Sequence, residues 1–319
     1  MNIPVTIHSD EKGYIDRECP NEECLFNFKI YAEDWKEKVS DEAVYCPLCG
    51  HVDTSDKWWT QKQLADIQNI AMNYATNYIN GELNKIFKPL ERKTKNSMIS
   101  FKYKSAKNKI IDPNIFSMPE WELELQCENC KTRYSIKGNA HFCPCCGVNT
   151  VDTVFERQLE IIKEQVDNIE VIRESINSNN ADAICSKIIE NSFCDCISAY
   201  QKFAFEKYKK CKGESKVKVN DFQIIEKGET LFKEIFNTTY SNWISKKERE
   251  YLNMFFQRRH ILEHNNGIVD EKYKEKTNDS LYALGRRIIV NEKDVYNLLG
   301  IIRKIGKEIN ENSKTHDKS

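Results

Sequence analysis

An arginine, two histidines and a carboxylate lie within six residues of this chain. The segment runs Gln257-Arg258-Arg259-His260-Ile261-Leu262-Glu263-His264-Asn265-Asn266-Gly267. A histidine imidazole can move the 2′-hydroxyl proton of RNA, because its ordinary pKa of about 6.5 lies near working pH. An arginine guanidinium stays charged and can hold two phosphate oxygens at once. Together these groups suffice to cleave RNA without a metal.

The same residues also suit an ordinary helix end. Arginine and protonated histidine near a helix C-terminus offset the helix dipole and bond its free carbonyls. On spacing alone this structural role is the simpler interpretation, and it stays open. A zinc protease site is excluded, because Ile261 and not a glutamate follows His260.

The segment resembles the active site of HEPN-domain ribonucleases, whose motif is an arginine, a polar residue, a few further residues and a histidine. Arg259, His260 and His264 stand at these positions here, followed by Asn265-Asn266-Gly267-Ile268-Val269-Asp270 and then Tyr273. The run from Leu284 to Val295 ahead of the last helix also resembles the end of such a domain. The resemblance covers about half of the chain, from near residue 155 to residue 310.

This resemblance implies a metal-independent endoribonuclease that leaves 2′,3′-cyclic phosphate and 5′-hydroxyl ends. We expect Arg259 to clamp the scissile phosphate, His264 to transfer protons and His260 to orient the site. Arg258 is either a second phosphate contact or a surface residue. Glu263 is expected in a solvated or salt-bridged position.

Arg259 and His264 cannot meet on one straight helix, because five positions turn the side chains about 140° apart. His260 and His264 are four positions apart and share a face. Either the helix unwinds before Asn265, or two such helices meet across a two-fold axis. HEPN ribonucleases commonly use the second arrangement, so a homodimer is expected.

Eight of the thirteen cysteines form two groups with the spacing of zinc ligands. The first group is Cys19, Cys24, Cys46 and Cys49, and the second is Cys127, Cys130, Cys143 and Cys146. Four thiolates leave no open position on the ion, so both zinc sites are expected to be structural. Cys145 is the variable residue of its knuckle, and His51 and His141 are expected to be neighbours and not ligands.

Size and composition set further limits. A chain of 319 residues is expected to hold several domains. Its 48 basic and 49 acidic residues exclude a polycation. The chain has no apolar run of about 18 residues, so no membrane span is expected. The first residues lack the pattern of a secretion signal. Zinc-type cysteine spacing favours a reducing compartment, so we expect a soluble, cytoplasmic protein.

The expected fold class is α+β and multidomain, with two small β-rich zinc ribbons joined by a helix and strands and followed by an all-α HEPN-like bundle. The expected parts are ribbon one at 14–55, a connector at 56–118, ribbon two at 119–152, the bundle at 153–310 and a polar, frayed tail at 311–319. Apolar spacing predicts helices at 60–89, 245–264 and 295–309, the last one capped by Asn291.

The connector contains a basic segment that alternates in polarity. Residues 85–109 carry nine Lys or Arg and one acid, and residues 97–104 alternate as in a strand. Lys102 and Lys104 could contact a nucleic-acid backbone while Phe101 and Tyr103 stack on bases. The alternative is an edge strand that its lysines protect from aggregation.

The leading expectation is therefore a zinc-ribbon HEPN endoribonuclease. Such domains often occur in toxins and antiviral effectors, so RNA, and a protein partner or inhibitor, are the expected partners. The ribbons would recognise the substrate or the partner. The main alternative is a non-catalytic module in which the ribbons bind nucleic acid or protein and the helical half only dimerises. A zinc-ribbon transcription regulator fits least, because no recognition helix is evident.

Overall fold

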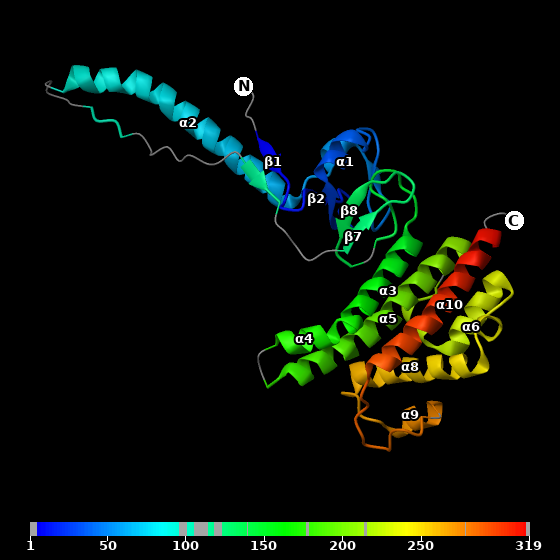
Figure 1. Ribbon diagram of the computed structural model, residues 1–319. Helices are drawn as coiled ribbons and strands as arrows, with labels where there is room; N and C mark the ends of the chain where they lie inside the picture. Colours follow the sequence, from blue (N-terminus) through cyan, green and yellow to red (C-terminus); the bar gives the residue numbers. More distant parts are fainter. Residues whose placement is uncertain are drawn as a thin grey trace. The chain divides into compact units, whose positions relative to one another are not determined.

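The structure is a computed structural model that describes residues 5–95, 101–104, 114–117, 123–138, 140–176, 179–213, 216–277 and 279–316. The chain forms two compact units, Met1–Thr150 and Val151–Ser319. The first unit carries the small sheets and both cysteine groups, and the second is helical (Figure 1). The protein is thus of mixed α and β class.

The first unit is built around a four-stranded antiparallel sheet in the order β2-β3-β8-β7. Its elements are β1 (Thr6–His8), β2 (Tyr14–Glu18), β3 (Asn27–Tyr31), α1 (Ala32–Glu37), β4 (Val44–Tyr45), β5 (Val52–Asp53), η1 (Ser55–Lys57), α2 (Gln61–Thr94), β6 (Asn114–Phe116), β7 (Leu123–Gln126) and β8 (Arg133–Ile136). The strands β1 and β6 pair in parallel, and β4 pairs with β5.

The sheet joins the two cysteine-bearing hairpins. Each hairpin gives its second strand to the centre, where Lys29 of β3 lies opposite Ser135 of β8. Asp34 of α1 accepts hydrogen bonds from the backbone and side-chain nitrogens of Arg133, at 2.7 to 3.0 Å. The sequence predicts two separate ribbons, whereas the structure pairs them into one body.

The long helix α2 departs from its predicted end. It begins near residue 60, as the apolar spacing predicts, and the Thr60 side chain caps it by accepting from the Gln63 backbone. The helix nevertheless continues through Pro89 to Thr94. Proline removes one helical hydrogen bond, but at this exposed position water can satisfy the freed carbonyl. The prediction that the helix ends by Pro89 is therefore wrong.

The predicted basic strand at residues 97–104 is wrong for the four of these residues that the structure describes. Phe101, Lys102, Tyr103 and Lys104 are outside any strand, while residues 97–100 lie outside the described residues. The rings of Phe101 and Tyr103 pack on Phe87 of α2, at centroid distances of 5.5 and 5.1 Å. This contact holds both rings against α2, and Phe101 remains 37% exposed.

The second unit is a set of helices around one hydrophobic core. Its elements are α3 (Val151–Asp167), α4 (Ile169–Ser175), α5 (Ala181–Lys212), η2 (Val219–Gln223), α6 (Ile225–Phe236), α7 (Tyr240–Trp243), α8 (Lys246–His264), α9 (Glu271–Lys276) and α10 (Glu292–His316). The central helix α5 packs against α3 and α10. Phe155 of α3 stacks on Phe203 of α5 with ring centroids 4.1 Å apart.

Helix α8 follows the predicted bounds closely. Ser245 caps its start by accepting from the Glu248 backbone, and Leu252, Phe255, Phe256 and Ile261 fill the core. Its end is fixed by Asn266 and Gly267, both in the left-handed region with φ of 52° and 75°. The Gly267 amide then donates to the carbonyl of Ile261 at 2.8 Å.

The final helix confirms its predicted cap and corrects its predicted end. Asn291 accepts from the Asp294 backbone, and Asp294 accepts from the Asn291 backbone. The helix extends to His316, so the frayed tail predicted from residue 311 is wrong up to that residue. Its apolar stripe continues as far as the buried Ile309, and Ser313 is buried too.

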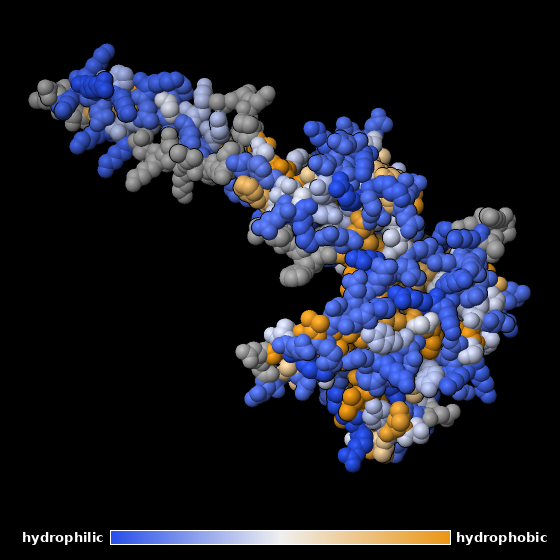
Figure 2. Space-filling view, in the orientation of Figure 1, coloured by the Kyte–Doolittle hydropathy of each residue, from blue (hydrophilic) through white to orange (hydrophobic). Residues whose placement is uncertain are grey.

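None of the described helices is long and apolar enough to cross a membrane. The face of the molecule seen in Figure 2 is mainly hydrophilic, with small separate hydrophobic areas.

Candidate metal centres and candidate active site

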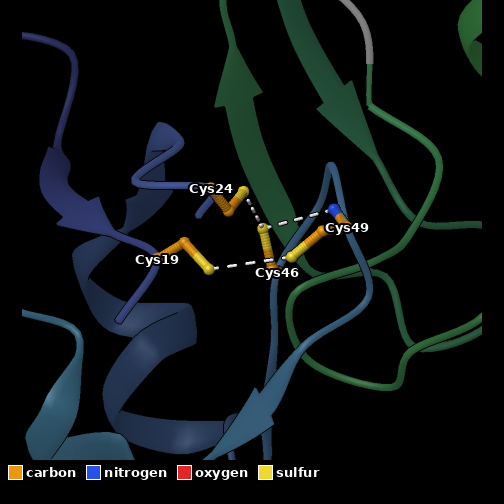
Figure 3. A group of neighbouring side chains, drawn as sticks. All are labelled: Cys19, Cys24, Cys46 and Cys49. Carbon is orange, nitrogen blue, oxygen red and sulfur yellow. Dashed lines mark hydrogen bonds between the residues drawn. The ribbon is translucent and has the colours of Figure 1, made fainter. Parts of the chain in front are cut away.

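The first metal centre brings together Cys19, Cys24, Cys46 and Cys49, with all four sulfur atoms within 4.8 Å of one another (Figure 3). The Cys19–Cys49 and Cys24–Cys46 sulfur pairs are each 3.8 Å apart. A tetrahedral ion with metal–sulfur bonds of about 2.3 Å requires sulfur separations of about 3.8 Å. The group therefore has the dimensions of a zinc site.

The second metal centre has the same form. Cys127 and Cys146 are 3.7 Å apart at sulfur, and Cys130 and Cys143 are 3.5 Å apart. Cys145 is not part of this group, and its thiol points to the carbonyl oxygen of Lys38 at 3.3 Å. Neither His51 nor His141 belongs to either group.

The electrostatics of these groups favour a bound cation. Burial raises the pKa of Cys46 to about 12 and also raises that of Cys19, so these two thiols stay protonated without a cation, whereas hydrogen bonds outweigh burial and lower the pKa of Cys49. Four thiolates placed this closely would repel each other without a positive charge between them. A divalent ion deprotonates such thiols and removes the repulsion. Both groups could therefore hold zinc, and neither leaves an open position for chemistry.

The two metal knuckles interlock. The Tyr45 amide donates to the Pro144 carbonyl at 3.0 Å, and the His141 amide donates to the Pro47 carbonyl at 2.6 Å. Gly147 has φ of +67°, and a Cβ there would lie 2.6 Å from the Tyr45 ring. Each knuckle thus depends on the position of the other, which links the two metal centres mechanically.

Arg259 lies in a polar cradle between helices. Its Nη1 donates to Oε1 of Gln201 at 2.8 Å and to Oε1 of Gln223 at 2.9 Å. Its Nη2 donates to Oγ of Ser198 at 3.2 Å and lies 3.0 Å from the Glu263 carboxylate. Its side chain is only 11% exposed. Three of these four acceptors are neutral.

Arg258, in contrast to Arg259, is held by charged acceptors. It is 1% exposed, and its guanidinium contacts the carboxylates of Asp279 at 2.9 Å and Asp294 at 3.4 Å. Tyr273 also donates to Asp279, at 2.6 Å. Although burial opposes ionisation, the bonds from Tyr273 and Arg258 lower the pKa of Asp279. The expectation of a surface or phosphate-contacting Arg258 is wrong, because two carboxylates neutralise it inside the unit.

The two histidines share an exposed face near the end of α8. The His260 and His264 rings are 4.9 Å apart between centroids, and both residues are exposed. Burial and the nearby positive charges of His264, Lys272 and Lys276 lower the pKa of His260 below its usual 6.5. The lowered pKa favours the neutral form of the His260 imidazole, which can accept a proton.

Within one chain, Arg259 and His264 do not converge. Helix α8 continues to His264, so the option in which the helix unwinds before Asn265 to swing this histidine around does not occur. Arg259 faces Gln201 of α5 while the histidine pair faces solvent. Glu263 takes the salt-bridged position expected for it, with Arg259.

Sequence reasoning did not find Ser198, Gln201 and Gln223. Gln201 is 2% exposed and its amide donates to Gln223 at 3.1 Å. One sequence feature could have indicated this polar site. Gln201 lies directly beside the apolar run of α5, three positions after Ser198. Lys102 and Lys104 are exposed and belong to the first unit, whereas the α8 residues belong to the second.

Comparison of the chain with family models, with curated proteins and with solved structures found no match.

We expect metal analysis to find two zinc ions in each chain. Cys46→Ser and Cys143→Ser should each remove about one ion, because three thiolates bind zinc far more weakly than four. Cys145→Ser is the matched control and should keep both ions. Inductively coupled plasma mass spectrometry on purified protein measures this directly. Full zinc content in Cys46→Ser, or a loss in Cys145→Ser, would contradict the assignment.

The two neighbouring arginines should differ in their effect on stability. Arg258→Ala leaves Asp279 buried without its main partner and should lower the free energy of unfolding by about 3–5 kcal/mol. Arg286→Ala, an exposed control, should change it by less than about 0.5 kcal/mol. Urea unfolding followed by circular dichroism reports on the helical unit. Equal stability of the two variants would show that the buried pair is not needed.

Proposed function

We propose that this chain is an endoribonuclease of the HEPN type that acts as a homodimer. One observation carries the proposal: three of the four groups that hold Arg259 are neutral oxygens, and Glu263 is the one carboxylate among them, so the charge of Arg259 is less fully offset than that of Arg258. The exposed imidazoles of His260 and His264 lie on the same helix. Their side chains supply the groups that RNA cleavage requires.

The proposed reaction needs no group outside this set. A neutral imidazole takes the proton of the 2′-hydroxyl, and that oxygen attacks the neighbouring phosphorus. The bond from phosphorus to the 5′-oxygen breaks, and an imidazolium returns a proton to the leaving oxygen. Arg259 stabilises the charge that develops on the phosphate oxygens. The products are a 2′,3′-cyclic phosphate and a 5′-hydroxyl.

The dimer supplies the geometry that one chain lacks. Because Arg259 and His264 point to different sides of α8, a cleft that uses both requires a second chain. We propose that two copies place the arginine of one protomer near the histidine of its partner. Zinc-bound hairpins in the first unit then recognise the substrate or a regulating protein. A role as a toxin or an antiviral effector follows from the same family resemblance.

A second candidate function is that of a non-catalytic binding protein, and the same contacts of Arg259 support it. Arg259 is 11% exposed, four side chains hold its guanidinium, and the Glu263 carboxylate offsets its charge. That arrangement also suits a purely structural arginine in a non-catalytic binding protein. Activity measurements separate the two functions.

Purified protein should cleave single-stranded RNA or transfer RNA in the presence of EDTA. Arg259→Ala and His264→Ala should each lower the rate by about a hundredfold or more, because each removes a group that acts on the transition state. Arg286→Ala is the control and should cleave normally. Gel analysis of labelled RNA, with detection of the cyclic phosphate, measures this. Undiminished cleavage by both variants would exclude the site, and no cleavage by the wild type would favour the binding protein.

A further inference from the structure

A cavity of about 730 Å³ lies between the first half of α8 and the first half of α10. It is lined by Lys247 and Tyr251 of α8 and by Lys293, Tyr296, Asn297 and Lys304 of α10. Small-molecule sites commonly occupy about 300–1,000 Å³. The cavity is therefore large enough for one nucleotide. None of the residues assigned to RNA cleavage lines it.

Two tyrosine rings form part of the lining. Tyr251 and Tyr296 are 39% and 38% exposed, so each presents a ring to solvent. Tyr251 stacks on the buried Phe255 at a centroid distance of 5.9 Å. The Tyr296 hydroxyl donates to the carboxylate of Asp167 at 2.7 Å. Because both rings are held in place, little conformational entropy is lost when a planar group stacks on them.

The charges at the cavity favour an anion. Glu248 is paired with Lys304, and Asp167 is paired with Lys163 at 2.5 Å. Among the described residues, Lys247 and Lys293 form no ion pair with a carboxylate. Lys247 instead lies 5.9 Å from the centre of the Tyr251 ring. Two ammonium groups without a carboxylate partner and two aromatic rings thus line the same cavity.

We propose that this cavity binds a nucleotide unit of single-stranded RNA, with a base against Tyr251 or Tyr296 and phosphates near Lys247 and Lys293. Stacking on an aromatic side chain is available to every base, so this site contributes affinity with little sequence preference. The choice of an RNA strand rests on the proposed ribonuclease function. The cavity then holds part of the substrate at a distance from the cleaved bond.

The test uses the full chain carrying His264→Ala, so that RNA is bound and not cut. Fluorescence anisotropy with a labelled single-stranded RNA gives the affinity at several salt concentrations. Lys247→Glu with Lys293→Glu should weaken binding about tenfold or more and lower the salt slope by about two. Tyr251→Ala should weaken binding by at least about fivefold. Lys246→Glu, exposed on the same helix outside the cavity, should keep near-normal affinity.

Titration with adenosine monophosphate distinguishes an RNA strand from a free nucleotide as the ligand of this cavity. If the parent binds RNA but not adenosine monophosphate, and the double variant loses RNA binding, the cavity is a site for an RNA strand. Binding of the free nucleotide that is lost in the same variant supports the site and adds free nucleotides as ligands. Circular dichroism must show that the variants stay folded. Affinities for both ligands equal to those of the parent would overturn the proposal.

These results remain distinct from the outcome for the nuclease. If the wild type does not cleave RNA but the double variant loses RNA binding, only the catalytic assignment fails. If the wild type cleaves RNA while cavity variants bind and cleave as well as it does, only the cavity assignment fails.

Discussion

A buried guanidinium requires acceptors, and the charge of those acceptors determines what else it can bind. Arg258 and Arg259 are neighbours in the sequence, yet they illustrate opposite solutions. The carboxylates of Asp279 and Asp294 fully offset the charge of the buried Arg258, and these contacts fix the loop before α10 against α8. Amide and hydroxyl oxygens hold most of Arg259, so its position is fixed while its charge is only partly offset. The proposed chemistry depends on this difference.

The first unit relies on a different kind of constraint. Two small hairpins have too little apolar surface to fold alone, and each contributes two cysteines to a group of four that matches a tetrahedral ion. Pairing of β3 with β8, the Asp34–Arg133 contact and the interlocked knuckles combine them into one body. Loss of either ion should therefore disturb both hairpins, since each knuckle supports the other.

Features that depend on neighbouring residues could be predicted from the sequence. Features that depend on contacts between distant residues could not. The caps at Ser245 and Asn291 and the cysteine spacing are encoded within a few residues, so the sequence indicates them directly. The pairing of β3 with β8 joins residues about a hundred positions apart, which no local pattern specifies. The Arg259 cradle is likewise assembled from α5, η2 and α8. Burial of Arg258 depends on Asp279, which lies twenty-one positions away.

The central claim is that Arg259 of one protomer and His264 of its partner act on the same phosphate, and subunit mixing tests it most directly. Differently tagged Arg259→Ala and His264→Ala chains are co-expressed, and the heterodimer is purified through both tags. Each parent homodimer should be inactive, while the heterodimer retains one intact cleft and should cleave RNA at about half the wild-type rate. A heterodimer as inactive as its parents would contradict a cleft shared between subunits.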